Sequence, residues 1–408
     1  MANQVDLDNN ATTRVLPEVV EAMLPFLTES YGNPSSIHRF GSQVGARIAA
    51  ARAQVAALIG ASDPVEVIFT GSGTEGDNAA IRGMLEAQPD KRHIVTTQVE
   101  HSAVLGLCQN LEKKGYRVTW LGVDTNGALD LAELRAALSD DTAVVSIMWA
   151  NNETGVIFPI EEIGAVVRAK GIPFHVDAVQ AAGKLAVNVK DLPVDLLTIS
   201  GHKFYAAKGI GALYVRRGIT FSPLLIGGHQ ERNRRAGTEN VAGIIGMGKA
   251  AEIALDRMAE DSVRIGRLRD LLESLLLESC PDSRINGSRQ NRLPNTANIS
   301  FRYLEGESIL VLLDQQGICA STGSACTAGS SEPSHVLRAM KVPADWLQGA
   351  VRFSLGRFNT EDEIRYVNEK VPGIVQRLRG LSALGKLGNE QRSQPDAVVA
   401  AGTIGTRG

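Results

Sequence analysis

The sequence lacks the features that mark several large classes of protein. Its 408 residues include only four cysteines, Cys108, Cys280, Cys319 and Cys326, and no C-x-x-C pair. A disulfide scaffold or a structural zinc site is therefore not expected. The net charge of −3 gives no bulk attraction to nucleic acid or to an anionic membrane, so we expect neither as a partner.

Membrane and targeting signals are missing as well. No apolar run approaches bilayer-spanning length, and residues 1–14 lack the basic-then-apolar pattern of a secretory signal. We therefore expect a cytoplasmic protein. Hydrophobic residues make up 44% of the chain, and its length predicts two domains.

Short β-rich runs alternate with helical patterns in the first half of the chain. The helical patterns fall at residues 44–58, 105–114 and 160–170, where apolar side chains recur every three or four positions. The runs that predict strands are residues 65–70, 93–98, 143–150, 173–178, 195–200 and 211–217. This alternation predicts an α/β domain with a mainly parallel sheet, and such sheets bind ligands at strand ends.

A second unit follows a long helical region at residues 241–278. It is predicted to be a smaller α+β domain. We expect the large domain over residues 14–258, and the small domain over residues 1–13 and 259–384. Residues 385–408 lack periodicity, which predicts a disordered tail.

The stretch ASTGSACTAGSSEPSH, residues 320–335, surrounds Cys326 with small and hydroxylated residues. Little there could bury a thiol, and a structural cysteine is normally buried and inert. We therefore interpret Cys326 as a reactive thiol on an exposed loop. Cys319 follows an apolar run and is expected to be buried, while Cys108 and Cys280 lie on helical patterns and receive no role.

Lys203 lies in SGHKFYAAKG, directly after a predicted strand. A lone lysine is usually a surface residue. Asp177, however, ends an earlier strand, with Gln180 three residues further on. A lysine with an acidic partner for a pyridinium nitrogen is the arrangement that holds pyridoxal phosphate (PLP), although Asp177 alone could be a strand-end cap.

A glycine-rich turn, TGSGTEGDN from Thr70, leads from the first predicted strand into a helix. Glycines and a helix N-terminus favour an anion, and Thr74 adds a hydroxyl, although such a turn alone is weak evidence. Ser200 and His202 could supply further phosphate contacts. The turn fits neither a Walker A loop nor the full dinucleotide-binding pattern.

Two more polar side chains follow predicted strands. His101 could cap the next helix, or it could stack on a cofactor ring and move protons near neutral pH. Asn152, in the sequence NNETG, could hydrogen-bond a ring oxygen.

Taken together and in this order, the motifs of residues 6–357 are specific for one family. The chain resembles the cysteine desulfurases of the class V, fold-type-I PLP enzymes, and most closely their NifS branch of nitrogen fixation. The motifs that carry the resemblance are LDNNATT, YGNPSSIH, FTGSGTEGDN, EHSAV, NNETG, HVDAVQ, SGHKFY, GIGALYVRR, RAGTEN, GSACTAG and VRFSLG. It implies the PLP-dependent fold type I, with a seven-stranded, mainly parallel sheet and a smaller C-terminal α+β domain.

The resemblance also implies roles for individual residues. Lys203 would bear PLP as a Schiff base and later act as the base, Asp177 would pair with the pyridine nitrogen, and His101 would stack on the ring. Gln180 and Asn152 would contact the ring oxygen. The phosphate would be held by Gly73, Thr74, Ser200 and His202, with Thr238 reaching in from the other subunit of a homodimer. Arg352 would grip the substrate carboxylate, with Asn33 and Asn152 beside it.

The implied reaction takes sulfur from L-cysteine and leaves L-alanine. Cys326 would attack the substrate sulfur and keep it as a persulfide, which a mobile loop would deliver to an iron–sulfur scaffold protein, with nitrogenase maturation as the expected destination. No metal is expected in the resting enzyme, although Cys326 could transiently ligate a cluster during transfer. The tail after about residue 384 matches nothing in the family.

Three alternatives remain open at this point. A selenocysteine lyase would prefer selenocysteine over cysteine. Another PLP-dependent enzyme of aminotransferase fold would not need Cys326. A non-catalytic scaffold is expected to have lost Lys203 or Cys326, and both are present.

Overall fold

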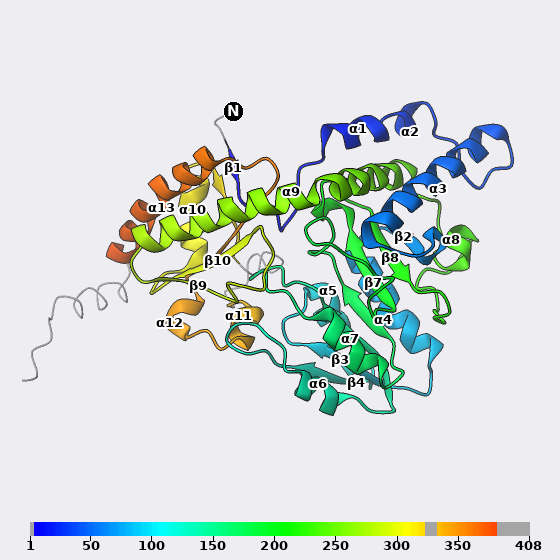
Figure 1. Cartoon of the computed structure of the whole chain (residues 1–408), viewed down its shortest axis with the longest axis horizontal. Helices are drawn as coiled ribbons and strands as arrows, with labels where there is room; N and C mark the ends of the chain where they lie inside the picture. Colours follow the sequence, from blue (N-terminus) through cyan, green and yellow to red (C-terminus); the bar gives the residue numbers. More distant parts are fainter. Residues whose placement is uncertain (1–3, 323–332, 382–408) are drawn as a thin grey trace, which may run out of the picture.

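The computed structural model describes residues 4–322 and 333–381, so Cys326 and the predicted tail lie outside the described residues. Within these ranges the buried hydrophobic residues line both faces of a seven-stranded sheet and fill a separate core in a smaller unit. Figure 1 shows the two units side by side, with helix α9 (Val241–Ser279) running along both. No helix in the described ranges combines the length and apolar character needed to cross a membrane.

The large unit is built on a mixed, mainly parallel sheet, which confirms the predicted α/β class. Its strand order is β2-β8-β7-β6-β5-β3-β4, and β8 runs in the opposite direction to the other six strands. The strands are β2 (Val67–Thr70), β3 (His93–Thr97), β4 (Arg117–Leu121), β5 (Thr142–Met148), β6 (Phe174–Asp177), β7 (Leu196–Ser200) and β8 (Gly211–Val215). Strand β4 was not predicted, because this half-exposed edge strand lacks the continuous apolar run of the central strands.

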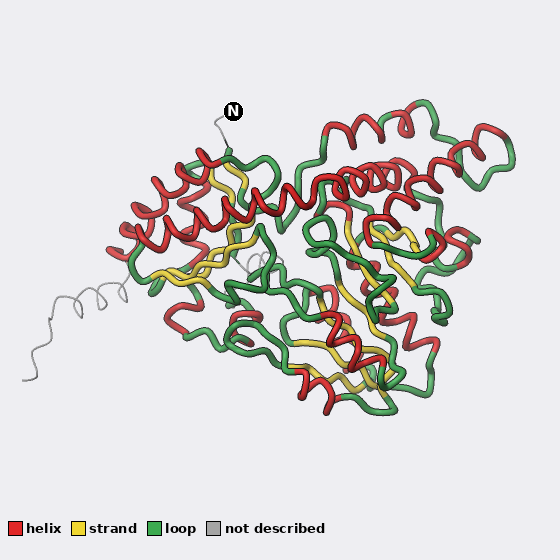
Figure 2. The backbone as a smooth tube through the Cα atoms, viewed as in Figure 1, coloured by secondary structure: helices red, strands yellow, loops and turns green. Residues whose placement is uncertain are grey.

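Helices cover both faces of this sheet, as Figure 2 shows. Alternate strand residues enter the two cores: in β5, Val145 and Ile147 face one layer and Val144 faces the other. Helices α4 and α5 pack on the Val144 face. The helices of the large unit are α1 (Pro17–Met23), α2 (Pro25–Thr28), α3 (Arg39–Ile59), α4 (Gly73–Ala87), α5 (Ser102–Lys113), α6 (Leu131–Ala137), α7 (Ile160–Arg168) and α8 (Gln230–Asn233), with single 3₁₀ turns η1 (Pro64–Glu66) and η2 (Gly201–Lys203).

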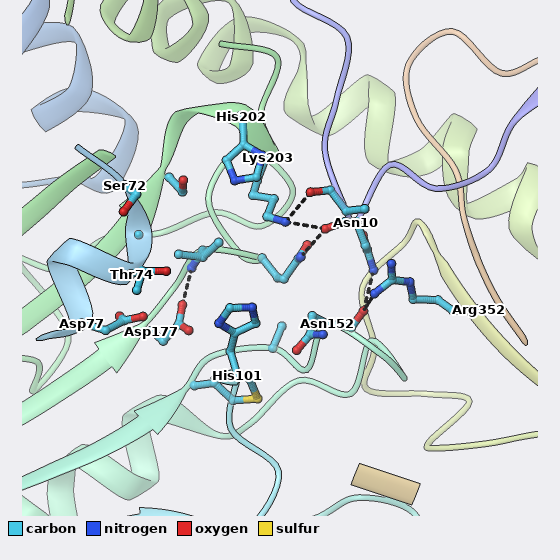
Figure 3. Close-up of a pocket in the computed structure, with 17 residues that line it drawn as sticks. Asn10, Ser72, Thr74, Asp77, His101, Asn152, Asp177, His202, Lys203 and Arg352 are labelled. Carbon is cyan, nitrogen blue, oxygen red and sulfur yellow. Dashed lines mark hydrogen bonds between the residues drawn. The ribbon is translucent and has the colours of Figure 1, made fainter. Parts of the chain in front are cut away.

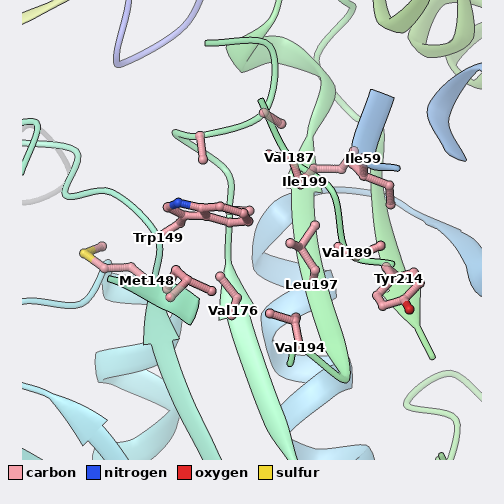
Figure 4. Packing of buried hydrophobic residues seen from close by; sticks show 14 of the residues in the cluster. Ile59, Met148, Trp149, Val176, Val187, Val189, Val194, Leu197, Ile199 and Tyr214 are labelled. Atoms are coloured by element: carbon pink, nitrogen blue, oxygen red, sulfur yellow. The ribbon is translucent and has the colours of Figure 1, made fainter. Parts of the chain in front are cut away.

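The core on the opposite face reaches up to the strand ends. Figure 4 shows Trp149, just beyond β5, packed near Val176 and Ile199 of the next two strands. These side chains are less than 9% exposed. Dense packing there fixes the direction in which the chain leaves each strand. The polar residues that are predicted to be functional come directly after these strand ends.

The smaller unit combines short strands with long helices. Strands β9 (Ser283–Ile285), β10 (Thr296–Phe301) and β12 (Ala350–Ser354) form an antiparallel sheet of order β12-β10-β9. Helices α10 (Gly306–Asp314) and α13 (Glu361–Leu381) and the second half of α9 supply its core. Two short helices, α11 (His335–Ala339) and α12 (Ala344–Leu347), follow the undescribed stretch. The domain boundary at residue 258 stays a prediction, and α9 passes through it without a break.

The N-terminal segment links the two units. Strand β1 (Val5–Asp6) pairs in parallel with β11 (Ile318–Cys319) of the smaller unit. A few residues later the Thr13 backbone N–H donates to the His202 carbonyl of the large unit at 2.9 Å. Residues 8–13 therefore cross between the units beside Lys203.

Candidate active site

A cavity of about 300 Å³ opens at the ends of the parallel strands, and Figure 3 shows it from close by. Ten of the residues predicted to bind cofactor or substrate line it: Gly73, Thr74, His101, Asn152, Asp177, Gln180, Ser200, His202, Lys203 and Arg352. These residues are spread over almost 280 positions of sequence. The sheet brings most of them together because parallel strands present their carboxyl ends at one edge.

Lys203 ends the short turn η2 that follows β7. Its Nζ donates hydrogen bonds to the main-chain oxygens of Asn10 at 2.6 Å and Ala11 at 2.8 Å. The lysine is therefore directed into the cavity and held against the N-terminal segment. A half-buried amine at this place can form a covalent bond with a carbonyl compound or move a proton.

Asp177 is the last residue of β6 and is buried. Its Oδ1 accepts the Val179 backbone N–H at 2.9 Å. Burial raises the pKa of Asp177, while His101, the Val179 N–H and Lys203 oppose that rise. A protonated ring nitrogen placed in the cavity would complement this buried carboxyl.

Two further buried carboxyls lie behind Asp177. Burial raises the pKa of Glu100 to about 8, and burial together with Asp177 raises that of Asp77. His175 belongs to β6. Burial lowers its pKa to about 3, so its imidazole is neutral. Its Nδ1 and Nε2 lie 2.9 Å from Ser146 Oγ and Thr198 Oγ1. Burial therefore favours the uncharged forms of these groups.

His101 serves as the N-cap of α5, as one of its two interpretations predicts, and it also lines the cavity, while stacking on a cofactor ring stays a prediction. Its Nδ1 accepts the Ala103 backbone N–H at 3.2 Å. This leaves the other ring nitrogen, Nε2, to carry the proton of the neutral imidazole. In Figure 3 the ring lies in the middle of the cavity, between Asp177 and Asn152.

The first turn of α4 forms one end of the cavity. Ser72 caps this helix, and its Oγ accepts the Glu75 backbone N–H at 3.1 Å. Across from it, Ser200 Oγ is buried with no hydrogen-bond partner among the described residues. A Cβ added at Gly73 would come within 2.9 Å of Val179 and 3.3 Å of Ser200. A helix N-terminus, an unpartnered hydroxyl and a glycine that keeps the space open together suit an anion.

His202 belongs to the same end of the cavity. Its Nδ1 lies 3.2 Å from Thr12 Oγ1. Burial, followed by Lys203 and other cations, lowers the pKa of His202 to about 4. The imidazole is therefore neutral at physiological pH and would meet an anion as a hydrogen-bond donor rather than as a charge.

Gln180 is oriented by a second lysine. Lys184 Nζ donates to Gln180 Oε1 at 2.9 Å, and Gln180 Nε2 donates to the Asn10 carbonyl at 3.0 Å. Because Oε1 is already engaged, Gln180 presents its amide N–H side to the cavity. It would therefore donate to a ring oxygen.

Arg352, in the middle of β12, closes the other end of the cavity and is buried. Its Nη1 donates to the Asn152 carbonyl at 3.0 Å and its Nη2 to Asp8 Oδ1 at 2.8 Å. Its Nε is buried without a partner among the described residues. The guanidinium therefore keeps donor capacity for a carboxylate.

Several lining residues were not predicted: Asn10, Ala11, Ser72, Asp77, Met148, Ala150 and Val179. Asn10 matters most, because its Nδ2 donates to the Asn152 carbonyl and to Thr296 Oγ1, while its own carbonyl accepts from Lys203 and Gln180. Ser72 could have been found, because Ser72 and Glu75 fit the S-x-x-E pattern that precedes helices. Asn10 lies within the motif LDNNATT, but nothing in that motif by itself assigns it a place in the cavity.

Two predicted residues, Asn33 and Thr238, are not among those that line this cavity. Asn33 is exposed, and its Oδ1 accepts the Ser35 backbone N–H at 2.9 Å in the turn before α3. Thr238 is exposed on the surface of the single chain. Cys326 lies outside the described residues. No group of three potential metal ligands is found among the residues that the structure describes.

Comparison with known proteins shows the family to which the chain belongs. The model of the class-V aminotransferases matches residues 5–367, and the chain belongs to this family. A cysteine desulfurase of Nostoc sp. is 62% identical over 92% of this chain and 94% of its own length. The cysteine desulfurase NifS of Azotobacter vinelandii is 55% identical over 93% of this chain and 94% of its own. Within the family, these likenesses place the chain among the cysteine desulfurases.

Solved structures lead to the same group. A NifS-like protein superposes with a TM-score of 0.87 at 40% identity, covering 92% of this chain and all of that one. The structure described as SspA in complex with cysteine superposes with a TM-score of 0.77 at 33% identity, covering 88% of this chain and all of that one. The fold with its seven-stranded, mostly parallel sheet is therefore that of the NifS-like enzymes.

The class-V aminotransferase family implies dependence on PLP, and the cavity fits that cofactor. The buried, unpartnered Ser200 hydroxyl and the open space at Gly73 provide an anion corner. Lys203 and the buried Asp177 lie in the same cavity. A phosphate, an aldehyde carbon and a ring nitrogen would each find a complementary group.

Proposed function

We propose that the chain removes sulfur from free L-cysteine, releases L-alanine and carries the sulfur as a persulfide on Cys326. The observation that supports the proposal is that one cavity is lined by Lys203, Asp177, His101 and Arg352. A lysine, a buried carboxyl, an imidazole and an arginine are the groups that amino-acid chemistry on PLP requires. The relative whose structure is described as a complex with cysteine supports the choice of substrate.

PLP would be held by Lys203 at its aldehyde, by Asp177 at its ring nitrogen and by Gly73, Thr74, Ser200 and His202 at its phosphate. His101 would stack on the ring, and Gln180 and Asn152 would contact its oxygen. When bound, the cofactor withdraws electrons and so acidifies the Cα–H of an attached amino acid.

The chain's own residues would then bind the substrate and move protons and sulfur. Arg352 would bind the substrate carboxylate, with Asn152 assisting. Lys203 Nζ would take the Cα proton and return a proton to the carbon skeleton. The Cys326 thiolate would attack the substrate sulfur, so that an S–S bond forms while the substrate C–S bond breaks. The electron pair of the broken bond stays on the carbon skeleton, which is protonated to alanine.

We further propose that the working unit is a cytoplasmic homodimer in which Thr238 of the partner subunit reaches the phosphate. Thr238 is exposed on the single chain. Large apolar side chains are also exposed nearby in sequence at Ile226 (87%) and, on the N-terminal helical segment, at Leu27 (63%) and Ile37 (100%). Exposed apolar side chains support an interface where they form one contiguous patch. Sedimentation analysis of the purified protein tests the dimer.

The destination of the sulfur is proposed to be an iron–sulfur scaffold protein, in the maturation of nitrogenase. The support is the NifS of Azotobacter vinelandii at 55% identity. Cys326 would contact the growing cluster only during transfer. Sulfur transfer to a purified nitrogenase-specific scaffold protein, compared with transfer to a general iron–sulfur scaffold protein, tests this destination.

The central experiment measures alanine released from L-cysteine in the presence of a reductant. It compares wild type, Cys326→Ala and Cys319→Ala after PLP content has been checked. Cys319 is a matched control, because it precedes the same segment and its Sγ accepts a hydrogen bond from Gln4. We expect alanine from wild type and Cys319→Ala only. Equal release from Cys326→Ala would point to a selenocysteine lyase or another PLP enzyme, and no release from any protein would refute the proposal.

A further inference from the structure

The turn that follows β6 carries a second lysine, Lys184, beside the cofactor cavity. Its carbonyl accepts the Ser262 hydroxyl of α9 at 2.9 Å. Gly183, with a φ of +75°, lets the turn approach Phe204, because a Cβ at Gly183 would lie 2.7 Å from the Phe204 Cβ. Phe204 directly follows Lys203. The backbone of Lys184 is therefore fixed next to the turn that bears Lys203.

The Lys184 amine contacts Gln180, which lines the cavity. Lys184 Nζ donates to Gln180 Oε1 at 2.9 Å and to the Gln180 carbonyl at 3.2 Å. On the other side, Gln180 Nε2 donates to the Asn10 carbonyl at 3.0 Å. An ammonium group can only donate and a carbonyl can only accept, so these neighbours fix one orientation of the Gln180 amide. Nε2 carries a second N–H, which can be donated into the cavity.

The positive charge of Lys184 lies in surroundings that oppose it. Burial, followed by the nearby cations Lys203 and Arg352, lowers the pKa of Lys184 to about 7. Lys184 in turn contributes to the low pKa of His202. An anion on the far side of Gln180 would favour the charged form of Lys184, since opposite charges attract. The ring oxygen of PLP carries negative charge and would supply that anion.

Helix α9, which meets Lys184 through Ser262, also carries an acidic residue, Asp261. Its carboxylate is already paired with Arg357 at 2.7 Å and with Arg264 at 3.8 Å. It is not among the groups that shift the pKa of Lys184. The side of the amine that faces the cavity is therefore the one where a bound anion would act on it.

We propose that Lys184 is a positioning residue that acts on the cofactor through Gln180: its ammonium group polarises the Gln180 amide and so strengthens the N–H that this amide donates to the ring oxygen of PLP. Hydrogen bonds in a chain polarise one another, and a bond from a cation is stronger than one between neutral groups. The Asn10 carbonyl helps to orient the amide but supplies no charge. The inference rests on the proposed function, through the proposed contact of Gln180 with PLP.

The predicted consequence is a change in the acidity of the Schiff base that Lys203 forms with PLP. When this Schiff base is protonated, its proton is shared with the ring oxygen. When it is deprotonated, the ring oxygen holds its negative charge alone. A stronger N–H donor at that oxygen therefore favours the deprotonated form, so the intact Lys184–Gln180 pair should lower the pKa of the Schiff base.

The test titrates the absorbance of the PLP-loaded proteins across neutral pH. It compares wild type, Lys184→Met, Gln180→Met and the double variant, because methionine is an unbranched side chain that carries no charge and no amide. Lys190→Met is the matched control, since Lys190 is an exposed lysine six residues further along the same loop. Two further quantities are measured on the cofactor-free proteins: the affinity for PLP and the free energy of unfolding.

We expect Lys184→Met to raise the midpoint of the titration by about 0.5–1 pH unit, the size of effect that a cation exerts through one partly buried amide. In the Gln180→Met background the same change should raise it by less than half as much, because the amide that connects the two groups is gone. Lys190→Met should titrate like wild type. Cofactor-free Lys184→Met should be at least as stable as wild type, because a cation is costly to bury, while its affinity for PLP should fall.

Several results would overturn the proposal. An unchanged midpoint in Lys184→Met would show that the amine does not act on the ring oxygen. Equal rises with and without Gln180 would show that Lys184 acts as a distant charge and not through the amide. If wild type forms the Schiff base but releases no alanine from L-cysteine, the proposed function fails, while the titration still decides the role of Lys184. A wild type that forms no Schiff base with PLP would overturn both.

Discussion

Arg352 Nη2 donates a hydrogen bond to Oδ1 of Asp8 at 2.8 Å, across 344 positions of sequence. The arginine side chain is 3% exposed and the aspartate side chain 26%. A buried guanidinium with an unpartnered Nε needs a fixed orientation to recognise a carboxylate. The N-terminal segment supplies that orientation through Asp8, which is not itself among the lining residues but holds the guanidinium that is proposed to bind the substrate carboxylate.

Asp8→Asn is therefore expected to raise the KM for L-cysteine several-fold with a smaller effect on kcat, and to lower the free energy of unfolding by about 1–2 kcal/mol, since Asp8 is partly solvated. Steady-state kinetics and chemical denaturation measure both. Asp141→Asn is the control, because it breaks an exposed Arg117–Asp141 pair of 3.3 Å. A lower KM in Asp8→Asn would mean that Asp8 competes with the substrate instead of orienting Arg352.

Gly73→Ala is expected to weaken PLP binding by at least about tenfold. The added Cβ would lie 2.9 Å from Val179 and 3.3 Å from Ser200, which is closer than carbon atoms normally approach. Gly106→Ala, on an exposed face of α5 with no atom within 4 Å, is the matched glycine control. Titration of the apo-proteins with PLP, followed by absorbance, measures the effect. Equal affinities for both variants would show that the first turn of α4 does not contact the cofactor.

Ser200→Ala should separate cofactor affinity from stability. In the cofactor-free protein the Ser200 hydroxyl is buried without a partner among the described residues, so its removal should leave the unfolding free energy unchanged or raise it by up to about 1 kcal/mol. PLP affinity should nevertheless fall, because a hydrogen bond to an anion is lost. Denaturation without PLP and titration with PLP give the two values. A clear loss of stability in Ser200→Ala without PLP would mean that the Ser200 hydroxyl does have a hydrogen-bond partner in the folded protein.

The buried Glu100 should make the stability of the fold depend on pH. Burial raises its pKa from 4.5 to about 8, so between these values the folded state holds a proton that the unfolded state has lost. Stability is thus lost as pH rises towards 8, by up to roughly 1.4 kcal/mol per pH unit from this group. Glu100→Gln removes the titrating group. The free energy of unfolding of the variant, relative to that of wild type, should therefore rise from pH 5 to pH 8. Parallel pH profiles for the two proteins would disprove this assignment.

Much of the fold and site could be predicted because the signals are local. The central strands are continuous apolar runs, and Lys203, Asp177 and His101 each stand at or just after the end of one. The edge strand Arg117–Leu121 was missed because its half-exposed residues carry no such run. Both readings of His101 had local support, and the structure shows that capping α5 and lining the cavity are compatible.

The sequence by itself determined the α/β class and the chemical groups of the site, because hydrophobic periodicity and strand-end motifs act over a few residues. Tertiary structure alone decided which groups complete that site. Asp8 meets Arg352, Asn10 meets Lys203, and Glu153 meets Ser334 only after segments that are far apart in the sequence have been brought together. The physical reason is that such contacts depend on the relative placement of distant strands, and the free energy that fixes this placement comes from burying whole cores rather than from any local preference.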